Sequence, residues 1–363
     1  MGELRRKAGV AKRRLLNAKA ELFPSDDAYD GRFTREVGPS EYTTDNNPAT
    51  KLIHARLDEA ALSAIGAAIG AADDEVNLPV PPGAAPKRVS LNDRWNAATG
   101  IERMRLDLVL GAYLEVPELL SATGLTTAQP PADVHAMSHT PFAAGGGFYQ
   151  ADLIAGALES VGAPIADGQR VLDFGCSSGR VARALAAAYP GADVFGCDPN
   201  GQAIEWAASN LLMAEFSKSE NDPPLDYPDD HFDAAFGVSI WSHYSERLAL
   251  KWYDEMHRVV KPGGHLISTT HGPESVAFYS EQGLRTTAQL SEILDAIYRR
   301  GYWYAPEFGE AGDWGVVNPD WGTSFVSAEW MLDNLRPKWQ VAEYAPGRNE
   351  RNQDVYVLRK AAG

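Results

Sequence analysis

The sequence predicts an α/β fold in which a doubly wound sheet with an antiparallel last strand follows a mainly helical N-terminal region. From residue 148 onward, short apolar runs alternate with helical patterns, which is typical of a parallel sheet covered on both faces. Near the C-terminus, the β-like runs KWQVAEY and DVYVLRK are joined by only nine residues, APGRNERNQ. Such a link permits a hairpin but not a parallel crossover, so we expect the last strand to be antiparallel to its neighbours.

Composition narrows the classes of protein to which this chain can belong. Its 363 residues exceed one average domain, and 44% hydrophobic residues suffice for a sizeable core. The formal net charge of −16 argues against a nucleic-acid binder, because binding phosphates requires a positive field. The two cysteines, Cys176 and Cys197, indicate neither a disulfide framework nor a cysteine-based zinc site. We therefore expect no metal and no nucleic-acid partner.

The N-terminal part of the sequence helps to predict the cellular location of the protein. It has no long apolar segment, so we expect no secretory signal and a cytoplasmic protein. The longest uncharged apolar run, residues 60–72, is too short to span a bilayer. Residues 1–23 have the pattern of a basic helix. Two interpretations stay open for it, docking on the acidic body of the protein or peripheral contact with an anionic membrane.

Residues 1–147 are expected to form a mainly helical region. Helical spacing predicts helices over about 51–72 and 91–114, with a proline-rich connector at 77–88. An irregular stretch is expected to begin near 122 and to run into 143–150. We expect this region to cap the carboxyl ends of the strands, where ligands bind in open α/β sheets.

Residues 148–363 carry the alternating pattern. Apolar, strand-like runs alternate there with helical patterns. The strands are expected at 170–174, 193–197, 232–238 and 264–270, and the helices near 178–189, 200–213 and 245–260.

Residues 273–336 are expected to be an insertion before the C-terminal hairpin. A predicted helix at about 286–300 is followed by an aromatic segment that contains four tryptophans, Trp303, Trp314, Trp321 and Trp330. Two interpretations stay open. The rings form a surface that stacks on sugars or other flat, hydroxylated ligands, or they form a small core packed against the N-terminal helices.

The stretch VLDFGCSSGR, residues 171–180, indicates a ligand site. Gly175 and Gly179 bracket the turn between an expected buried strand and a helix, where missing Cβ atoms and free N–H groups let a ligand approach the backbone. The spacing fits the dinucleotide pattern G-x-G-x-x-G poorly, because Ser177 and Arg180 stand where that pattern needs glycines. Asp198 ends the next expected strand, and an acid at that place can hold both hydroxyls of a ribose.

These residues resemble the class I S-adenosylmethionine-dependent methyltransferase family, which has a Rossmann-like fold. The family's first motif is similar to VLDFGCSSGR, its acidic second-strand tip to Asp198, and its fourth-strand region to PPLDYPDDHFDAAFGVSIWSHYSE at 223–246. Its fifth-strand approach is similar to MHRVVKPGGHLISTTHG at 256–272. The resemblance covers about 148–272, and 336–360 fits the family's reversed final strand. Ser177 departs from it, since the family more often has glycine there.

The resemblance implies that S-adenosylmethionine is the cofactor and assigns residues to its parts. Gly175, Cys176, Ser177 and Gly179 would line its methionine portion, near which Asp173 orders the loop. Asp198 would hold the ribose, and Pro199 would pack on the adenine. Ser219 and Asn221 would read the adenine edge. Ser239 and Trp241 would flank the sulfonium region, and Tyr149 would reach the carboxylate. For Trp241, a place in the core is an equal alternative.

Methyl transfer to a hydroxyl needs a proton acceptor. His271 is the preferred candidate, His243 the second and His139 a weaker third. A weaker resemblance to bacterial methyltransferases of sugar and polysaccharide biosynthesis implies O-methylation of a glycan-type hydroxyl. The alternatives are O- or N-methylation of a small natural product, a nicotinamide-type oxidoreductase and a non-catalytic protein that keeps the cofactor fold.

Overall fold

A computed structural model of the chain describes residues 46–72, 75–78, 87–131, 134, 143–308 and 317–361. The predicted basic helix at 1–23, most of the connector at 77–88, His139 and Trp314 lie outside these residues. Within them, no helix combines the length and the apolar composition needed to cross a membrane.

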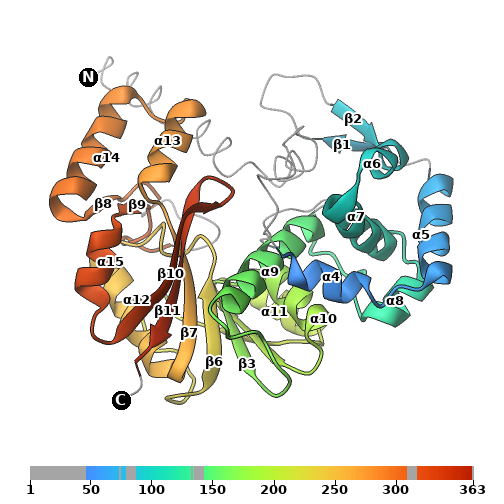
Figure 1. Cartoon of the computed structure of the whole chain (residues 1–363), viewed down its shortest axis with the longest axis horizontal. Coiled ribbons are helices and arrows are strands. Elements are labelled where there is room, and N and C mark those ends of the chain that lie inside the picture. The colour runs from blue at the N-terminus through green and yellow to red at the C-terminus, as the bar shows by residue number, and fades with distance from the viewer. Residues whose placement is uncertain are drawn as a thin grey trace.

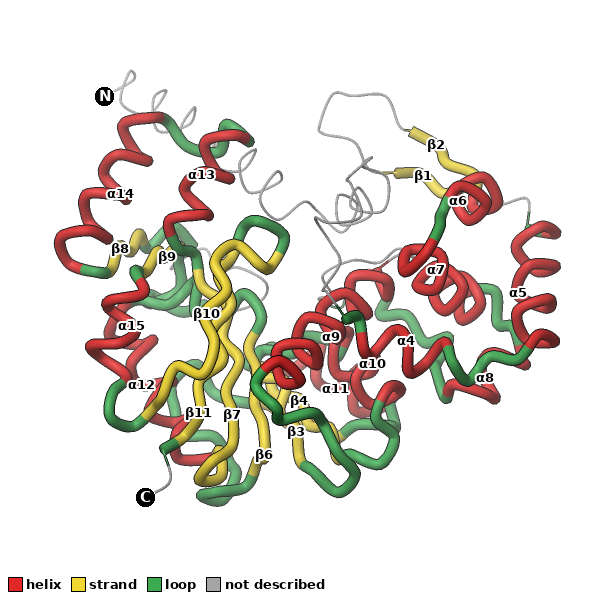
Figure 2. The backbone as a smooth tube through the Cα atoms, in the orientation of Figure 1, coloured by secondary structure: helices red, strands yellow, loops and turns green. Residues whose placement is uncertain are grey.

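A seven-stranded sheet forms the centre of the part of the chain that follows residue 148 (Figures 1 and 2). The spatial order of its strands is β5-β4-β3-β6-β7-β11-β10. Its strands are β3 (Arg170–Phe174), β4 (Asp193–Asp198), β5 (Glu215–Lys218), β6 (Phe232–Gly237), β7 (Val260–Thr270), β10 (Trp339–Asn349) and β11 (Gln353–Lys360). Within this sheet, β3 to β7 are parallel, and β11 runs antiparallel to both β7 and β10. The predicted fold class is confirmed, including the antiparallel last strand.

Alternating side chains of the strands build two cores, one on each face of the sheet. On β3, Val171 belongs to a core shared with α9 (Ala143–Ser160) and α10 (Arg180–Ala188). Leu172 and Phe174 belong to a second core shared with α12 (Glu246–Val259). A further helix, α11 (Gly201–Asn210), links β4 to β5. Both faces are therefore covered, as the sequence predicts.

The N-terminal helices form an outer layer that packs on α9 and α10 (Figure 1). They are α4 (Pro48–His54), α5 (Glu59–Ala71), α6 (Leu91–Ala97), α7 (Gly100–Tyr113) and α8 (Pro117–Thr123), and a short hairpin of β1 (Glu75–Leu78) and β2 (Lys87–Ser90) precedes α6. Arg105 of α7 and Asp152 of α9 form a fully buried ion pair at 2.7 Å that ties this layer to the sheet region. The layer lies beside the helices that cover the sheet.

Three local predictions in this region are wrong. The predicted helix at 51–72 is two helices, because the Asp58 side chain accepts a hydrogen bond from Ala61 N at 2.8 Å and starts α5 afresh. The predicted helix at 91–114 is also two, because the chain is extended at Thr99 and left-handed at Gly100, with φ of 56°. Residues 143–150 are the first turns of α9.

The insertion at 273–336 packs on the second core. It contains α13 (Pro273–Glu281), α14 (Thr287–Arg300), the hairpin of β8 (Tyr302–Ala305) and β9 (Thr323–Val326), and α15 (Ala328–Leu335). Trp321 and Trp330 are buried with α12, and Trp303 is buried with α14. These three rings are therefore mainly core. Trp321 and Trp330 belong to the core that contains α12, and Trp303 belongs to a separate core of the insertion itself. Neither core contains a residue of α4 to α8, so the predicted contact with the N-terminal helices is wrong.

Candidate functional site

A cavity opens at the carboxyl ends of β3, β4, β5 and β6. Its other walls come from α9, from the insertion and from the turn between β10 and β11. Nine of the predicted cofactor residues line it: Asp173, Gly175, Cys176, Ser177, Asp198, Pro199, Ser219, Asn221 and Ser239. None of the described residues 46–131 lines it, so α4 to α8 do not form the predicted cap.

The turn after β3 is shaped by left-handed backbone. Gly175, Ser177 and Gly179 have φ of 79°, 50° and 77°, a region that favours glycine. A Cβ on Gly175 would lie 2.2 Å from Cδ1 of Ile240, and one on Gly179 would lie 2.7 Å from Cζ of Phe216. Gly175 therefore keeps the floor of the cavity open. Gly179 does not line the cavity, and the constraint on it comes from packing against β5.

Two buried carboxyl groups stand at the tips of neighbouring strands. Asp173 accepts a hydrogen bond from Ala182 N at 3.1 Å, and burial raises its pKa to about 8. Asp198 accepts from Ser177 N and Asn200 N, both at 2.8 Å, and burial raises its pKa to about 6. The backbone hydrogen bonds fix the positions of both carboxyl groups. Because burial disfavours their charged forms and raises their pKa values, a ligand that is cationic or donates hydrogen bonds would stabilise those charged forms.

Several polar atoms of the cavity lining lack hydrogen-bond partners among the residues that the structure describes. They include Oγ of Ser219 and Oδ1 of Asn221, which follow β5. Buried polar groups are seldom left unpaired, so a ligand rich in hydrogen-bonding groups suits these positions. Together with the acid at the tip of β4 and the open glycine turn, they fit a nucleoside-type cofactor.

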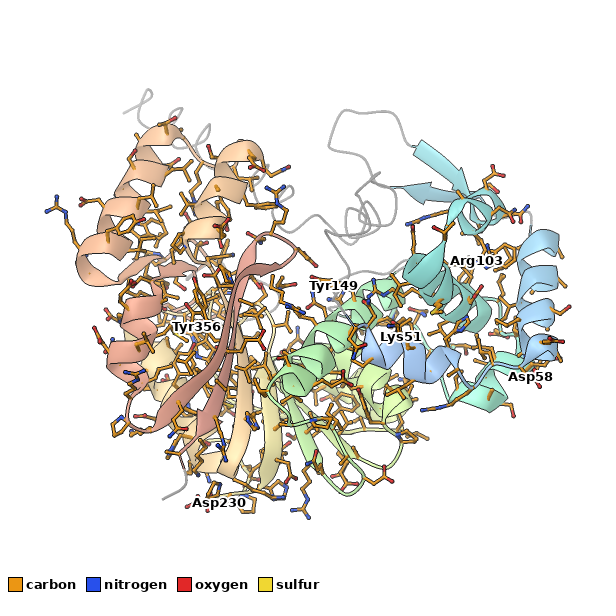
Figure 3. All side chains as sticks on the ribbon, viewed as in Figure 1. Lys51, Asp58, Arg103, Tyr149, Asp230 and Tyr356 are labelled. Atoms are coloured by element: carbon orange, nitrogen blue, oxygen red, sulfur yellow. The ribbon has the colours of Figure 1, made fainter. Side chains whose placement is uncertain are left out.

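Two predicted cofactor residues besides Gly179 lie outside the lining. The Tyr149 hydroxyl contacts the turn between β10 and β11, where it accepts from Glu350 N at 3.2 Å and lies 3.3 Å from the carbonyl oxygen of Arg348. Figure 3 shows Tyr149 near this hairpin tip, whereas Asp230 lies at the opposite end of the sheet. Trp241 is buried and stacks on Tyr253 with ring centroids 4.9 Å apart, which is the alternative of a core residue. Tyr149 thus supports a wall of the cavity.

The two histidines differ in their access to the cavity. His243 lines it, and its Nδ1 donates to the carbonyl oxygen of Gly322 at 2.7 Å, since a carbonyl only accepts. In the neutral ring, Nε2 is then the unprotonated nitrogen. His271 is fully buried behind it, outside the lining, with the two ring centroids 6.4 Å apart. Burial first, and then the neighbouring His243, lowers the pKa of His271 to about 3.

Comparison with known families agrees with this geometry. Residues 171–264 match a family model described as a methyltransferase domain. These residues therefore form a methyltransferase domain, in agreement with the family that the sequence resembles. The match covers the glycine turn after β3, Asp198 and the region around β6, which hold predicted cofactor residues that line the cavity.

Curated relatives are similar to part of this chain at moderate identity. Sterol 24-C-methyltransferase ERG6A of Gibberella zeae is 36% identical over 28% of this chain and 27% of its own length. Fatty-acid O-methyltransferase of Mycolicibacterium smegmatis is 33% identical over 30% and 39%, and malonyl-[acyl-carrier protein] O-methyltransferase of Herminiimonas arsenicoxydans is 29% identical over 42% and 62%. The chain therefore spans less than two thirds of the length of each of these relatives.

Solved structures also resemble part of this chain. A SAM-dependent methyltransferase from Methanosarcina mazei is 20% identical and matches 55% of this chain and 95% of its own, with a TM-score of 0.40. A putative sarcosine dimethylglycine methyltransferase from Galdieria sulphuraria is 13% identical and matches 60% and 86%, also with a TM-score of 0.40.

Sequence reasoning missed one wall of the methyltransferase domain's cavity. Gln150 lines it from α9, Trp321 from the insertion, and Asn349, Glu350, Asn352 and Gln353 from the turn between β10 and β11. Only the polar run RNERNQ marks this turn in the sequence, and such a run is typical of any exposed turn. Its place at the cavity follows from the pairing of β11 with β7.

Backbone strain gathers at the same cavity. Ser177, Ser239 and Glu350 line it from three different loops, and their φ values are 50°, 62° and 61°. A side chain in this region costs roughly 1–2 kcal/mol, so the surroundings must hold it in place. Strained residues of this kind cluster at functional sites.

Proposed function

We propose that the chain is an enzyme that transfers a methyl group from S-adenosylmethionine to a small organic acceptor. The observation that carries the proposal is the cavity at the carboxyl ends of β3 to β6, where the matched methyltransferase domain places Asp198 beside the glycine turn. This is the edge of an open α/β sheet at which ligands bind.

The residues of the cavity suit the parts of this cofactor. Asp198 would accept from the ribose hydroxyls, since each carboxylate oxygen can accept more than the one backbone hydrogen bond it has. Ser219 and Asn221 would pair with the adenine edge through oxygen atoms that the described residues leave unpaired. When bound, the cofactor would supply a methyl group on a positively charged sulfur. A nucleophile would attack the methyl carbon, and the electron pair of the carbon–sulfur bond would remain on the sulfur.

In this proposal the chain orients the acceptor and takes its proton. His243 is the better candidate for that role, because it lines the cavity and its Nδ1–H is fixed on Gly322. His271 is separated from the cavity, and a pKa of about 3 makes it a weak base. A positioned proton acceptor next to the incoming nucleophile is what O-methylation of a hydroxyl requires, whereas an amine acceptor needs no strong base.

The acceptor that we propose is a small molecule instead of a glycan. The sugar interpretation depended on the tryptophans of the insertion, and those that the structure describes, Trp303, Trp321 and Trp330, are buried in apolar cores. Of these three, only Trp321 also lines the cavity. The relatives described above are named for a sterol, a fatty acid and malonyl-[acyl-carrier protein], and none is named for a sugar. Both observations favour the alternative of a small natural product or metabolite.

The first test is calorimetric titration with S-adenosylhomocysteine. We expect Asp198→Asn to weaken binding by at least tenfold, because it removes the proposed ribose acceptor charge. Asp193→Asn is the matched control, since Asp193 begins the same strand and is exposed at its other end. Undetectable binding to the wild-type protein, or equal binding by both variants, would contradict the proposed cofactor site.

The second test identifies the acceptor. Methyl-labelled S-adenosylmethionine is incubated with the wild-type protein and fractionated small-molecule and glycan extracts, with Asp198→Asn as the inactive control. Label that enters small molecules only with the wild-type protein supports the proposal. Label confined to a glycan fraction would restore the sugar acceptor.

A further inference from the structure

We propose that Gln353 is a positioning residue whose buried amide holds the turn after β6 in the geometry that methyl transfer requires. The turn after β6 comprises residues 239–243, and its Ser239 and His243 both line the cavity. The inference rests on the proposed function. It adds a residue that acts on the reaction through the residues it holds.

The turn after β6 is compact and reaches both sides of the cavity. His243 N donates to the carbonyl oxygen of Ile240 at 3.0 Å, which closes the turn. Ile240 packs against the glycine turn after β3, since a Cβ on Gly175 would lie 2.2 Å from its Cδ1. A shift of the turn after β6 would therefore displace Ile240 from the glycine turn and move the proposed proton acceptor, His243, at the same time.

The turn begins with strained backbone that needs support. Ser239 has φ of 62°, a left-handed conformation that is unfavourable for serine and persists only where its surroundings hold it. Ser239 N donates to Oγ1 of Thr269 at 2.7 Å, and Nε2 of Gln353 donates to Oγ of Ser239 at 2.8 Å. Hydrogen bonds thus fix both the backbone and the side chain of the strained residue.

The Gln353 amide is fully used in holding this turn. Its Oε1 accepts from Oγ1 of Thr269 at 2.8 Å and from Nδ2 of Asn349 at 2.9 Å. Its Nε2 donates to Oγ of Ser239 at 2.8 Å and to Oγ of Ser242 at 3.3 Å. A primary amide has two accepting and two donating positions, and all four are taken. Although Gln353 lines the cavity, its amide has no hydrogen-bonding position left for a ligand, so it affects the reaction through the turn.

The reversed last strand explains how Gln353 reaches this place. Gln353 begins β11, and the antiparallel pairing with β7 sets Val355 opposite Thr269. The start of β11 therefore lies at the carboxyl end of β7, beside the end of β6, which pairs with β7 in parallel. From the insertion, Ser324 N donates to the carbonyl oxygen of Ser242 at 2.8 Å. The turn after β6 is thus held between the C-terminal hairpin and the insertion.

The test uses two matched pairs of variants. Gln353→Met removes the amide at similar volume, and Gln340→Met makes the same change at an exposed position of β10. Thr269→Val removes the hydroxyl that joins Gln353 to Ser239. Thr270→Val is its control, because Oγ1 of Thr270 is buried without a hydrogen-bond partner among the described residues.

Three quantities are measured for each variant. They are the free energy of unfolding in urea, the Kd for S-adenosylhomocysteine, and kcat and KM for methyl-labelled S-adenosylmethionine with the extract fraction that accepts label from the wild-type protein. We expect Gln353→Met and Thr269→Val to lower kcat by about tenfold or more, because misplacing reacting groups can cost about 100-fold in rate. The KM and the Kd should stay within about threefold of wild type, and both controls should keep the wild-type kcat within about twofold.

Several outcomes overturn the inference. They are a loss in kcat of less than about tenfold in either folded variant, a loss that lies entirely in the affinity for S-adenosylhomocysteine, or an equal loss in Gln340→Met or Thr270→Val. If Gln353→Met does not fold, Thr269→Val decides the question by the same criteria. A wild-type protein that binds no S-adenosylhomocysteine, or that labels no fraction, overturns the proposed function itself, so the two failures are distinguishable.

Discussion

The imidazole of His243 stacks on the indole of Trp321, with ring centroids 4.7 Å apart and an interplanar angle of 29°. The two residues are 78 positions apart, and Gly322, next to Trp321, accepts the hydrogen bond from Nδ1 of His243. The insertion therefore sets both the plane and the protonation pattern of a histidine that follows β6. The first prediction depends on this relationship.

Replacing His243 is expected to impair catalysis, and replacing His271 is not. His243→Asn should lower the initial rate of methyl transfer by about 100-fold, the usual contribution of a positioned proton acceptor. His271→Asn should stay within a few-fold of the wild-type rate, because His271 does not line the cavity. The measurement is label transfer to the identified acceptor pool under matched saturation with cofactor. Equal losses in both variants, with normal S-adenosylhomocysteine binding, would contradict the assignment.

Gly175→Ala and Gly168→Ala separate backbone strain from steric conflict. Both glycines have positive φ, 79° and 76°, so each alanine should lower the free energy of unfolding by roughly 1–2 kcal/mol. A Cβ at 168 meets nothing within 4 Å, whereas one at 175 would clash with Ile240. We expect only Gly175→Ala to weaken S-adenosylhomocysteine binding, by at least tenfold. Urea unfolding and calorimetry check the two effects, and similar affinities in both variants would refute the steric argument.

Asp173 should make the ligand-free protein less stable as the pH rises. Burial raises its pKa in the folded state from 3.8 to about 8, so the folded state binds more protons than the unfolded state between these values. The free energy of unfolding then falls as pH increases through this window, at up to about 1.4 kcal/mol per pH unit from this group. Asp173→Asn should remove this slope from unfolding curves recorded at pH 5, 6.5 and 8. A slope unchanged by the substitution would contradict the raised pKa.

Breaking the buried Arg105–Asp152 pair should lower the free energy of unfolding far more than breaking an exposed ion pair. Asp152 also accepts from Thr50 N at 2.8 Å and from Thr50 Oγ1 at 2.6 Å, so it is held as a buried carboxylate. Arg105→Met should destabilise the protein by about 3–5 kcal/mol, because it leaves that charge uncompensated. Arg299→Met breaks an exposed pair with Asp295 and should cost less than about 0.5 kcal/mol. Chemical denaturation of both variants measures the difference, and similar costs would argue against a charged Asp152.

Strong local patterns account for what could be predicted from the sequence. The apolar runs that became β3, β4, β6 and β7 and the glycine turn at 175–179 were all recognisable, because burial on both faces leaves a continuous apolar signal. The strand β5 was not predicted, since its residues Glu215–Lys218 are only half-buried or exposed and show no apolar run. The helix breaks at Asp58 and Gly100 depend on single capping or left-handed residues inside otherwise helical patterns.

The wall of the cavity formed by α9 and the turn between β10 and β11 could not be predicted for a different reason. Asn349 lies 199 residues from Gln150 in the chain, and the pairing of β11 with β7 brings the turn that contains it to α9. The choice between His243 and His271 likewise depends on depth below the cavity. Both follow a strand at the same edge of the sheet, and nothing in the sequence shows that His271 is covered by α13 and β9, whose Tyr279 and Phe325 pack on its ring.

The helix α9 has a practical consequence for how this chain can be divided. Its residues share one apolar core with both the sheet and the N-terminal layer, and its Asp152 is neutralised by Arg105 from that layer. A fragment that starts at residue 148 would expose the apolar face of α9 and would leave Asp152 without Arg105. We therefore expect this fragment to aggregate during expression. The two regions should melt together as one cooperative unit, so a piece suited to biophysical work has to contain both.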